Sequence, residues 1–420
     1  TYLIAKYITD SKWTGVVSAT LVSVIPGTLY ARTVVGFAQH HVLEVVFLLA
    51  VIYYTIKALD KAEDDVITWE VIKLKEWDNL KSWLKMVGLA SLSVLVYYST
   101  WPPGMMVFGL LAGSAVLYAL ITYQTENPTE PVLLTFIAIL VSTVIAVLVN
   151  QPTTDIQGVA QPSLLHLGIS LVSLIGTSLL FVFNRYAQEN NWSANKFRGT
   201  SIAVGIITFG IIGLIQPSIL QTIFDNIIRL LGYPFGLGTG GNSIQTIAEE
   251  QSSSIVELST SQYGLLLITA IIGMISHLTG IINKSVTDKK YASQLFLVVV
   301  SIFLTVISIR TIRFNYYLAP IVAIYSVILM KSIIDYIEIP KARSELKGYQ
   351  ILTIILLIVV IVPIIFVPVS GSVFGGQDRV SIYSYQEWEE PLDWMSDSTQ
   401  PDNIPQYSSS GEQPYDYGND

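Results

Sequence analysis

The chain has 420 residues, of which 52% are hydrophobic and only 13% are charged, and its mean hydropathy is +0.56. This composition excludes an ordinary soluble domain and is typical of a protein that crosses the membrane many times. The net charge of −8 and a sequence pI near 5.1 argue against a nucleic-acid partner. The absence of cysteine excludes disulfides, thiolate nucleophiles and zinc–thiolate sites.

Apolar runs long enough to cross a bilayer follow one another along most of the chain. We therefore expect an all-α polytopic membrane protein with eleven spans, at residues 13–30, 42–59, 83–101, 104–123, 131–149, 163–183, 200–220, 263–282, 291–309, 316–336 and 350–369. The mixed segment 60–81 is predicted to form a helix along the membrane surface. Residues 1–370 would form a transmembrane domain with external loops 30–42 and 221–262, and the polar segment 371–420 would begin an extracytoplasmic C-terminal domain.

The distribution of basic residues orients this bundle. If the chain starts inside, eighteen of its 23 Lys and Arg residues lie in loops on the cytoplasmic side. The basic residues left on the outer side are Arg32, Arg229, Arg310, Arg313 and Arg379. The loops 30–42 and 221–262 then face the extracytoplasmic side together.

A pair of histidines marks the first of three polar features on that outer side. His40 and His41 open a span, and Glu44 follows one turn further in. Imidazole and carboxylate groups at this spacing can ligate a divalent ion. Two interfacial histidines at a helix N-terminus are the alternative interpretation.

Carboxylates in the long external loop are the second feature. Glu249 and Glu250 follow the flexible pair Gly240 and Gly241. A carboxylate there can ligate a hard cation or accept a hydrogen bond from a substrate. Glu257 is a rival for this role, and a solvated loop charge is the alternative.

Arg313, in the sequence Arg-Thr-Ile-Arg-Phe-Asn-Tyr-Tyr between two spans, is the third feature. A guanidinium near membrane depth is costly and binds a phosphate bidentately, although it can also reach lipid headgroups. Isolated His166 and His277 are predicted to pack or to form interhelical hydrogen bonds. A metal, a carboxylate and an arginine at one membrane face indicate transfer from a lipid-linked phosphate donor.

These segments resemble the catalytic subunit of oligosaccharyltransferase, most closely its archaeal single-subunit form. Thr246-Ile247-Ala248-Glu249 is similar to that family's TIXE motif, residues 30–44 to its second acidic motif, and 313–317 to its Arg-Phe-X-Tyr-Tyr segment. The resemblance implies a GT-C-type transmembrane bundle with about eleven of thirteen spans present. An Asp-X-Asp motif would then precede residue 1 and a WWDYG motif would follow residue 420, so we expect this part to be inactive alone.

The resemblance also implies roles for individual residues. His41 would ligate Mg²⁺ or Mn²⁺, and Gln39 stands where the family has an aspartate, which should weaken binding of a hard ion. Glu249 would complete the metal site or orient the acceptor amide. Arg313, with Tyr316, would face the donor phosphates. The alternative candidates for the site are His40, Glu44 and Glu257.

The implied reaction transfers an oligosaccharide from a polyprenyl-phosphate or -pyrophosphate carrier, such as a dolichol, to asparagine in Asn-X-Ser/Thr. The implied partners are the lipid-linked oligosaccharide, an acceptor polypeptide and the cell membrane, with the active site outside and no further subunit. Two other interpretations stay open from the residues. One is another lipid-dependent glycosyltransferase of the O-mannosyl or arabinosyl type, and the other is a secondary transporter, which would show repeated halves around a midplane site.

Overall fold

The computed structural model describes residues 1–25, 27–33, 40–123, 129–154, 160–215, 255, 258–283 and 290–336. All of them belong to one compact unit, Thr1–Pro368, and none to a second unit, Val369–Asp420. The predicted span 350–369, most of the loop 221–262 and the predicted C-terminal domain lie outside the described residues. The domain boundary near residue 370 therefore stays a prediction.

The described residues form helices and no strands. In chain order these are α1 (Tyr2–Thr9), α2 (Lys12–Val24), α3 (Thr28–Thr33), α4 (His41–Asp64), α5 (Trp69–Lys73), α6 (Trp77–Thr100), the 3-10 turn η1 (Pro102–Met105), α7 (Met106–Thr122), α8 (Thr129–Val149), α9 (Leu164–Glu189), α10 (Ala194–Ile215), the π-helical turn η3 (Leu258–Tyr263), α13 (Leu266–Asn283), α14 (Tyr291–Arg310), the 3-10 turn η4 (Ile312–Phe314) and α15 (Asn315–Tyr336). Among the residues described, eight helices are long and apolar enough to cross a membrane. They coincide with eight of the eleven predicted spans, so the all-α polytopic fold is confirmed.

Two sequence predictions need correction at helix ends. The first predicted span, 13–30, ends as α2 at Val24, and α3 follows Gly27, whose φ of +99° breaks the helix. The predicted surface helix 60–81 does not form. Instead α4 runs on to Asp64, α6 starts at Trp77, and only the short α5 lies between them, because Val66 and Lys75 both adopt positive φ.

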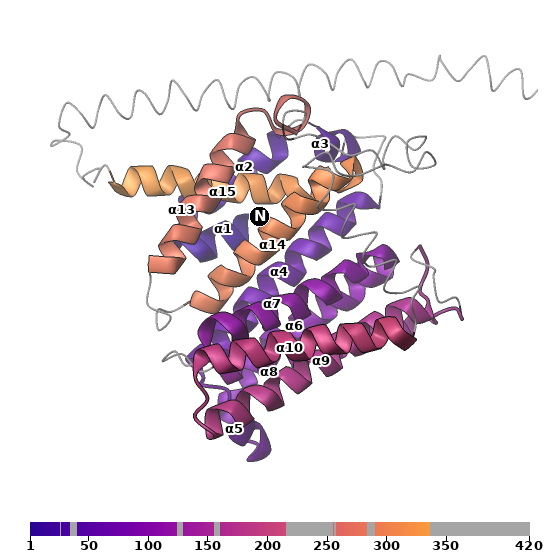
Figure 1. Ribbon diagram of the computed structural model, residues 1–420. Helices are drawn as coiled ribbons and strands as arrows, with labels where there is room; N and C mark the ends of the chain where they lie inside the picture. Colours follow the sequence, from indigo (N-terminus) through magenta and orange to yellow (C-terminus); the bar gives the residue numbers. More distant parts are fainter. Residues whose placement is uncertain are drawn as a thin grey trace, which may run out of the picture. The chain divides into compact units, whose positions relative to one another are not determined.

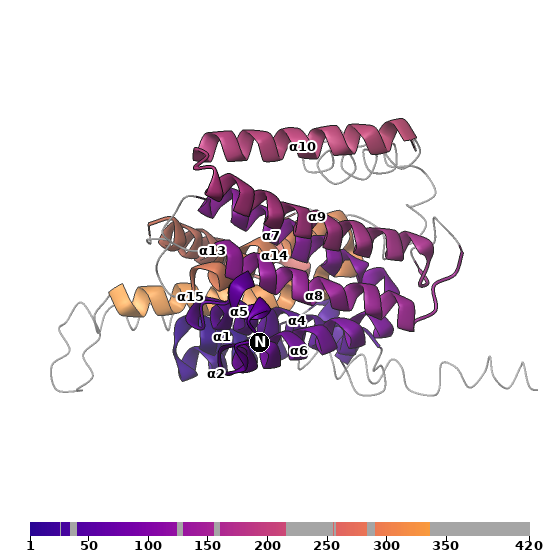
Figure 2. The ribbon, with the colours of Figure 1, turned by 90° about the horizontal axis from the view of Figure 1, so that it is seen from below.

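Two helices organise the packing (Figure 1). Helix α4 contacts α6, α8 and α14, and α15 contacts α13, α14 and α2, so the two together reach most of the bundle. Figure 2 shows α10 as the outermost helix, next to α9. Its side chains Ile206, Ile207 and Leu214 are exposed, as expected for a surface that faces lipid tails.

Different polar contacts lie at the two ends of the helix bundle. At one end, the Tyr98 hydroxyl lies 2.7 Å from His166 Nδ1, an interhelical hydrogen bond, which is one of the two roles predicted for that histidine. At the opposite end, Lys290 donates to the Tyr7 carbonyl at 3.0 Å and pairs with Asp10. The described lysines of the predicted cytoplasmic loops lie at the same end of the bundle as Lys290. His41 and Arg313 lie at the other end, with His166. The compartment that each end faces stays a prediction.

Helices α13 and α15 approach each other closely at Gly273. A Cβ placed on Gly273 would lie 2.1 Å from the backbone carbonyl oxygen of Tyr325. Only a residue without a side chain permits this distance, as at many membrane helix contacts. The His277 ring, one turn further along α13, packs on the Tyr325 ring with centroids 5.8 Å apart, as predicted. Gly280, on the same helix, has open space where a Cβ would lie, with no neighbouring atom within 4 Å, and so tolerates a methyl group.

We expect Gly273→Ala to destabilise the protein by about 1–3 kcal/mol, because the methyl group forces α13 and α15 apart. The midpoint of thermal unfolding in detergent measures this. Gly280→Ala is the matched control and should leave the midpoint unchanged or slightly raised, since alanine favours the helix. Equal midpoints for the two variants would contradict the close approach.

Candidate metal and phosphate site

A carboxylate at the start of α4 is the centre of the site. Glu44 lies in the first turn of the helix and is completely buried. Its Oε1 lies 2.9 Å from His41 Nδ1 and 3.3 Å from His40 Nε2. The i, i+3 and i, i+4 spacings of the helix bring these three side chains together.

The first turn of α15 supplies the other partners of Glu44. Tyr316 and Tyr317 are both buried, and their hydroxyl groups donate to Glu44 Oε2 at 2.8 Å and 2.5 Å. Charge-assisted bonds of this length are among the strong hydrogen bonds of proteins. The carboxylate therefore joins α4 to α15 although 272 residues separate Glu44 from Tyr316.

The residues of this cluster fit a divalent metal ion. One possible ligand atom from each of His40, His41 and Glu44 lies within 4.8 Å of the others. His41 is nearly buried, and its Nδ1 is also 3.3 Å from the Tyr316 hydroxyl. Nitrogen and oxygen donors at these separations suit first-row divalent ions.

An aromatic stack positions Arg313 beside the cluster. The Arg313 guanidinium lies over the Trp101 ring, 5.7 Å from its centroid. Trp101 in turn packs on Tyr317 and Phe314, with centroids 5.9 Å and 6.1 Å apart. Within the described part of the chain, the buried Arg313 Nε has no hydrogen-bond partner. A buried unpaired donor is costly and suits a site that receives an acceptor from a ligand.

A second guanidinium reaches the same tyrosine pair from α3. Arg32 lies over the Tyr316 ring, 5.1 Å from its centroid. The two arginines are far apart in sequence, yet Arg32 rests on a tyrosine that donates to Glu44, and Arg313 rests on Trp101, which packs on the other such tyrosine. A concentration of positive charge at this point suits an anionic group such as a phosphate.

The structure thus brings together five of the predicted site residues: His40, His41, Glu44, Arg313 and Tyr316. Three others, Gln39, Glu249 and Glu257, lie outside the described residues, so their roles stay predictions. Tyr316 was expected to face the donor phosphates, and here its hydroxyl donates to Glu44. Its phosphate role also stays a prediction.

Sequence reasoning missed three contributors to this site. Arg32 was noted only as a basic residue on the outer side, although its position near the histidine pair was a usable signal. Tyr317 repeats Tyr316 and could have been paired with it. Trp101 closes a span before two prolines, and nothing in its local pattern indicates contact with Arg313.

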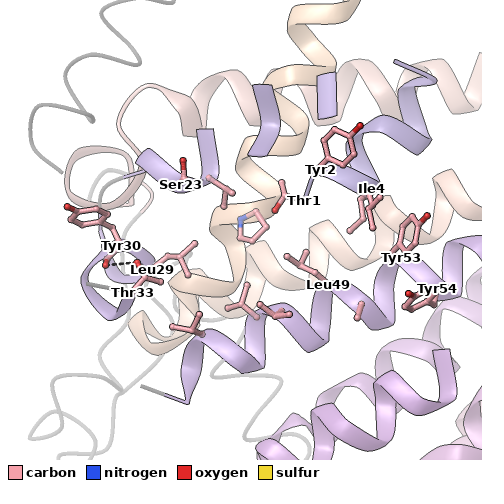
Figure 3. A pocket seen from close by; sticks show the side chains of 17 residues that line it. Thr1, Tyr2, Ile4, Ser23, Leu29, Tyr30, Thr33, Leu49, Tyr53 and Tyr54 are labelled. Atoms are coloured by element: carbon pink, nitrogen blue, oxygen red, sulfur yellow. Dashed lines mark hydrogen bonds between the residues drawn. The ribbon is translucent and has the colours of Figure 1, made fainter. Parts of the chain in front are cut away.

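An apolar cavity of about 630 Å³ adjoins the site (Figure 3). It is bounded by α1, α2, α3 and α4, together with Pro320 of α15. Its lining includes Tyr30 and Thr33, neighbours of Arg32, and Val42, the neighbour of His41. The cavity offers no carboxylate or imidazole among its described lining residues, so the metal candidates remain the residues around Glu44.

Comparison with known proteins shows the family to which the chain belongs. Residues 1–370 match the family described as oligosaccharyl transferase STT3, N-terminal. The chain is 24% identical to the dolichyl-monophosphooligosaccharide–protein glycotransferase AglB of Haloferax volcanii and 18% identical to the dolichyl-phosphooligosaccharide–protein glycotransferase 3 of Archaeoglobus fulgidus. Each comparison covers 95% of this chain, but only 44% and 45% of the relatives. The chain thus spans less than half of their length.

Solved structures share the fold. An archaeal oligosaccharyltransferase AglB from Archaeoglobus fulgidus, in complex with an inhibitory peptide and a dolichol-phosphate, superposes with a TM-score of 0.75 at 15% identity, over 100% of this chain and 48% of that one. A complex of the Archaeoglobus fulgidus enzyme with Zn and sulfate gives a TM-score of 0.65 at 14% identity, over 100% of this chain and 45% of that one. These likenesses confirm the predicted GT-C-type bundle. With the family match over residues 1–370, they identify the chain as a multi-pass membrane protein of the STT3 oligosaccharyltransferase family.

Proposed function

We propose that this chain is the transmembrane part of a glycosyltransferase for protein N-glycosylation. The enzyme would transfer an oligosaccharide from a polyprenyl-phosphate or -pyrophosphate carrier to asparagine in Asn-X-Ser/Thr. The observation that carries the proposal is the convergence of His41 and Glu44 with Arg313 at one end of the bundle. The relatives are named for this reaction, and one solved relative is described with a dolichol-phosphate and a peptide.

The arginines would bind the phosphate of the donor. Arg313 is held by Trp101 and Arg32 by Tyr316, so both guanidinium groups are positioned before a ligand arrives. A planar guanidinium can contact two phosphate oxygens at once, and preorganised charge costs little at the moment of reaction. The arginines thereby orient the bond between the sugar and the carrier.

His41 would be the main described ligand of a divalent ion, with His40 and Glu44 as nearby alternatives. By family resemblance, Gln39 and Glu249 would complete the site, and Mg²⁺ or Mn²⁺ would occupy it. Bound there, such an ion would stabilise negative charge on the departing phosphate. A solved relative is described in complex with Zn and sulfate, a divalent cation and an anion, which supports the proposal.

The site would face the extracytoplasmic side of the cell membrane, because the opposite end carries the lysines of the predicted inner loops. The acceptor polypeptide would approach from that side, where Glu249 would orient the asparagine amide. The protein would act as a single subunit.

The intact protein, purified in detergent, is expected to glycosylate a peptide containing Asn-X-Thr when supplied with its lipid-linked oligosaccharide and Mn²⁺. The product is measured as a mass increase on the asparagine. Peptides with Gln for Asn, or Ala for Thr, should give none. Transfer to a hydroxyl group instead would favour an O-glycosyltransferase, and donor binding without any product would contradict the proposal.

Arg313→Lys should reduce catalytic efficiency with the donor by about tenfold to a hundredfold, because one charge-assisted contact contributes roughly 1.5–3 kcal/mol. Lysine keeps the charge and loses the two-point contact and the stacking on Trp101.

The matched control is Arg185→Lys, at the opposite end of the bundle. Arg185 pairs only loosely with Glu70, Glu130 and Glu189, at 3.7 Å in each case. Surface pairs of this kind contribute little. The control should therefore keep the activity of the unchanged protein, and an equal loss in both variants would remove Arg313 from the donor site.

A further inference from the structure

We infer that Glu44 is a positioning residue that fixes the tautomer of His41, and that Tyr316 and Tyr317 hold Glu44 in place for this task. His41 would then ligate the metal through Nε2, and Glu44 would not touch the ion. This inference rests on the metal site of the proposed function. It assigns which residue would contact the ion and which would only position that ligand.

The hydrogen bonds around Glu44 determine where each proton lies. Each tyrosine hydroxyl has one proton, and both protons are directed at Glu44 Oε2. His41 Nδ1 therefore faces two acceptors, Glu44 Oε1 at 2.9 Å and the Tyr316 oxygen at 3.3 Å. A nitrogen lone pair pointed at both would be repelled. Nδ1 must carry the proton, and in a neutral ring the lone pair is then on Nε2.

This arrangement is the usual one for a metal-binding histidine. Such residues donate their second ring N–H to a carboxylate or carbonyl, which orients the ring and strengthens the ligand nitrogen. Glu44 also brings a negative charge next to the site, although position 39 holds a neutral glutamine. The carboxylate thus offsets part of the charge missing from the ligand set.

The occupancy of Oε2 argues against Glu44 as a direct ligand. Both of its strong hydrogen bonds come from buried tyrosines, and Oε1 is shared by the two histidines. A metal ion on Glu44 would have to displace one of these donors and leave it unpaired in the interior, which costs free energy.

The substitution Tyr317→Phe distinguishes a positioning role of Glu44 from direct ligation of the metal, because the Tyr317 hydroxyl donates to Glu44 and not to the histidines. If Glu44 positions His41, the loss of this hydroxyl loosens the carboxylate and should raise the dissociation constant for Mn²⁺ about tenfold, within the range found for such outer partners. If Glu44 ligates the metal, Tyr317→Phe frees Oε2 and the dissociation constant should stay unchanged or fall. That outcome would overturn the inference.

Binding of Mn²⁺ alone to the intact protein in detergent is measured by electron paramagnetic resonance of the free ion. Tyr54→Phe, on the same helix as Glu44 but at the cavity, is the matched control and should bind Mn²⁺ as the unchanged protein does. Thermal unfolding of both variants reports whether either has lost its fold.

A second measurement observes the ring nitrogens of His41 directly. Labelling of histidines with ¹⁵N, compared between the unchanged protein and a His41→Gln variant, identifies the His41 resonances. We expect a protonated Nδ1 and an unprotonated Nε2 without metal, and a shift of the Nε2 resonance on addition of Zn²⁺. A protonated Nε2 would overturn the inference. Neither measurement uses donor or acceptor, so their failure is distinct from a failure of the glycosylation assay.

Discussion

The buried carboxylate of Glu44 is the interaction on which the site depends. Taking a charge out of water is expensive unless several donors replace the lost hydration, and here hydroxyl and imidazole groups from two helices do so. Because the donors come from both α4 and α15, the first turns of these helices have a fixed relation. The histidines, Arg32 and Arg313 are all placed by elements that rest on this junction.

The sequence was sufficient for the fold because membrane helices are specified by simple physics. A bilayer demands about twenty apolar residues per span, and the eight helices from α4 onwards that meet this criterion follow it closely. The wrong predictions concern helix ends and short helices, which hydropathy does not determine. The short α2, the break at Gly27 and the missing surface helix at 60–81 depend on backbone conformations of single residues, such as Val66 and Lys75.

The site could be predicted in part from sequence. His40, His41 and Glu44 follow from helical spacing alone, and the motif around Arg313 indicated an anion-binding residue. The link between the two segments could not be predicted, since nothing in either segment shows that Tyr316 and Tyr317 donate to Glu44. The contribution of Trp101 to the site could not be predicted for the same reason. Its partners come from η4 and α15, and only the tertiary structure brings the rings together.

The proline within α15 bears on how this junction can move. Pro320 lies inside the helix and has no backbone N–H, so the carbonyl of Tyr316, four residues earlier, lacks its intrahelical donor. The first turn of α15, which carries both tyrosines, is therefore joined to the rest of the helix by one backbone hydrogen bond fewer than in a regular helix. The hydrogen bonds from Tyr316 and Tyr317 to Glu44 therefore restrain a turn that the helix itself holds less firmly.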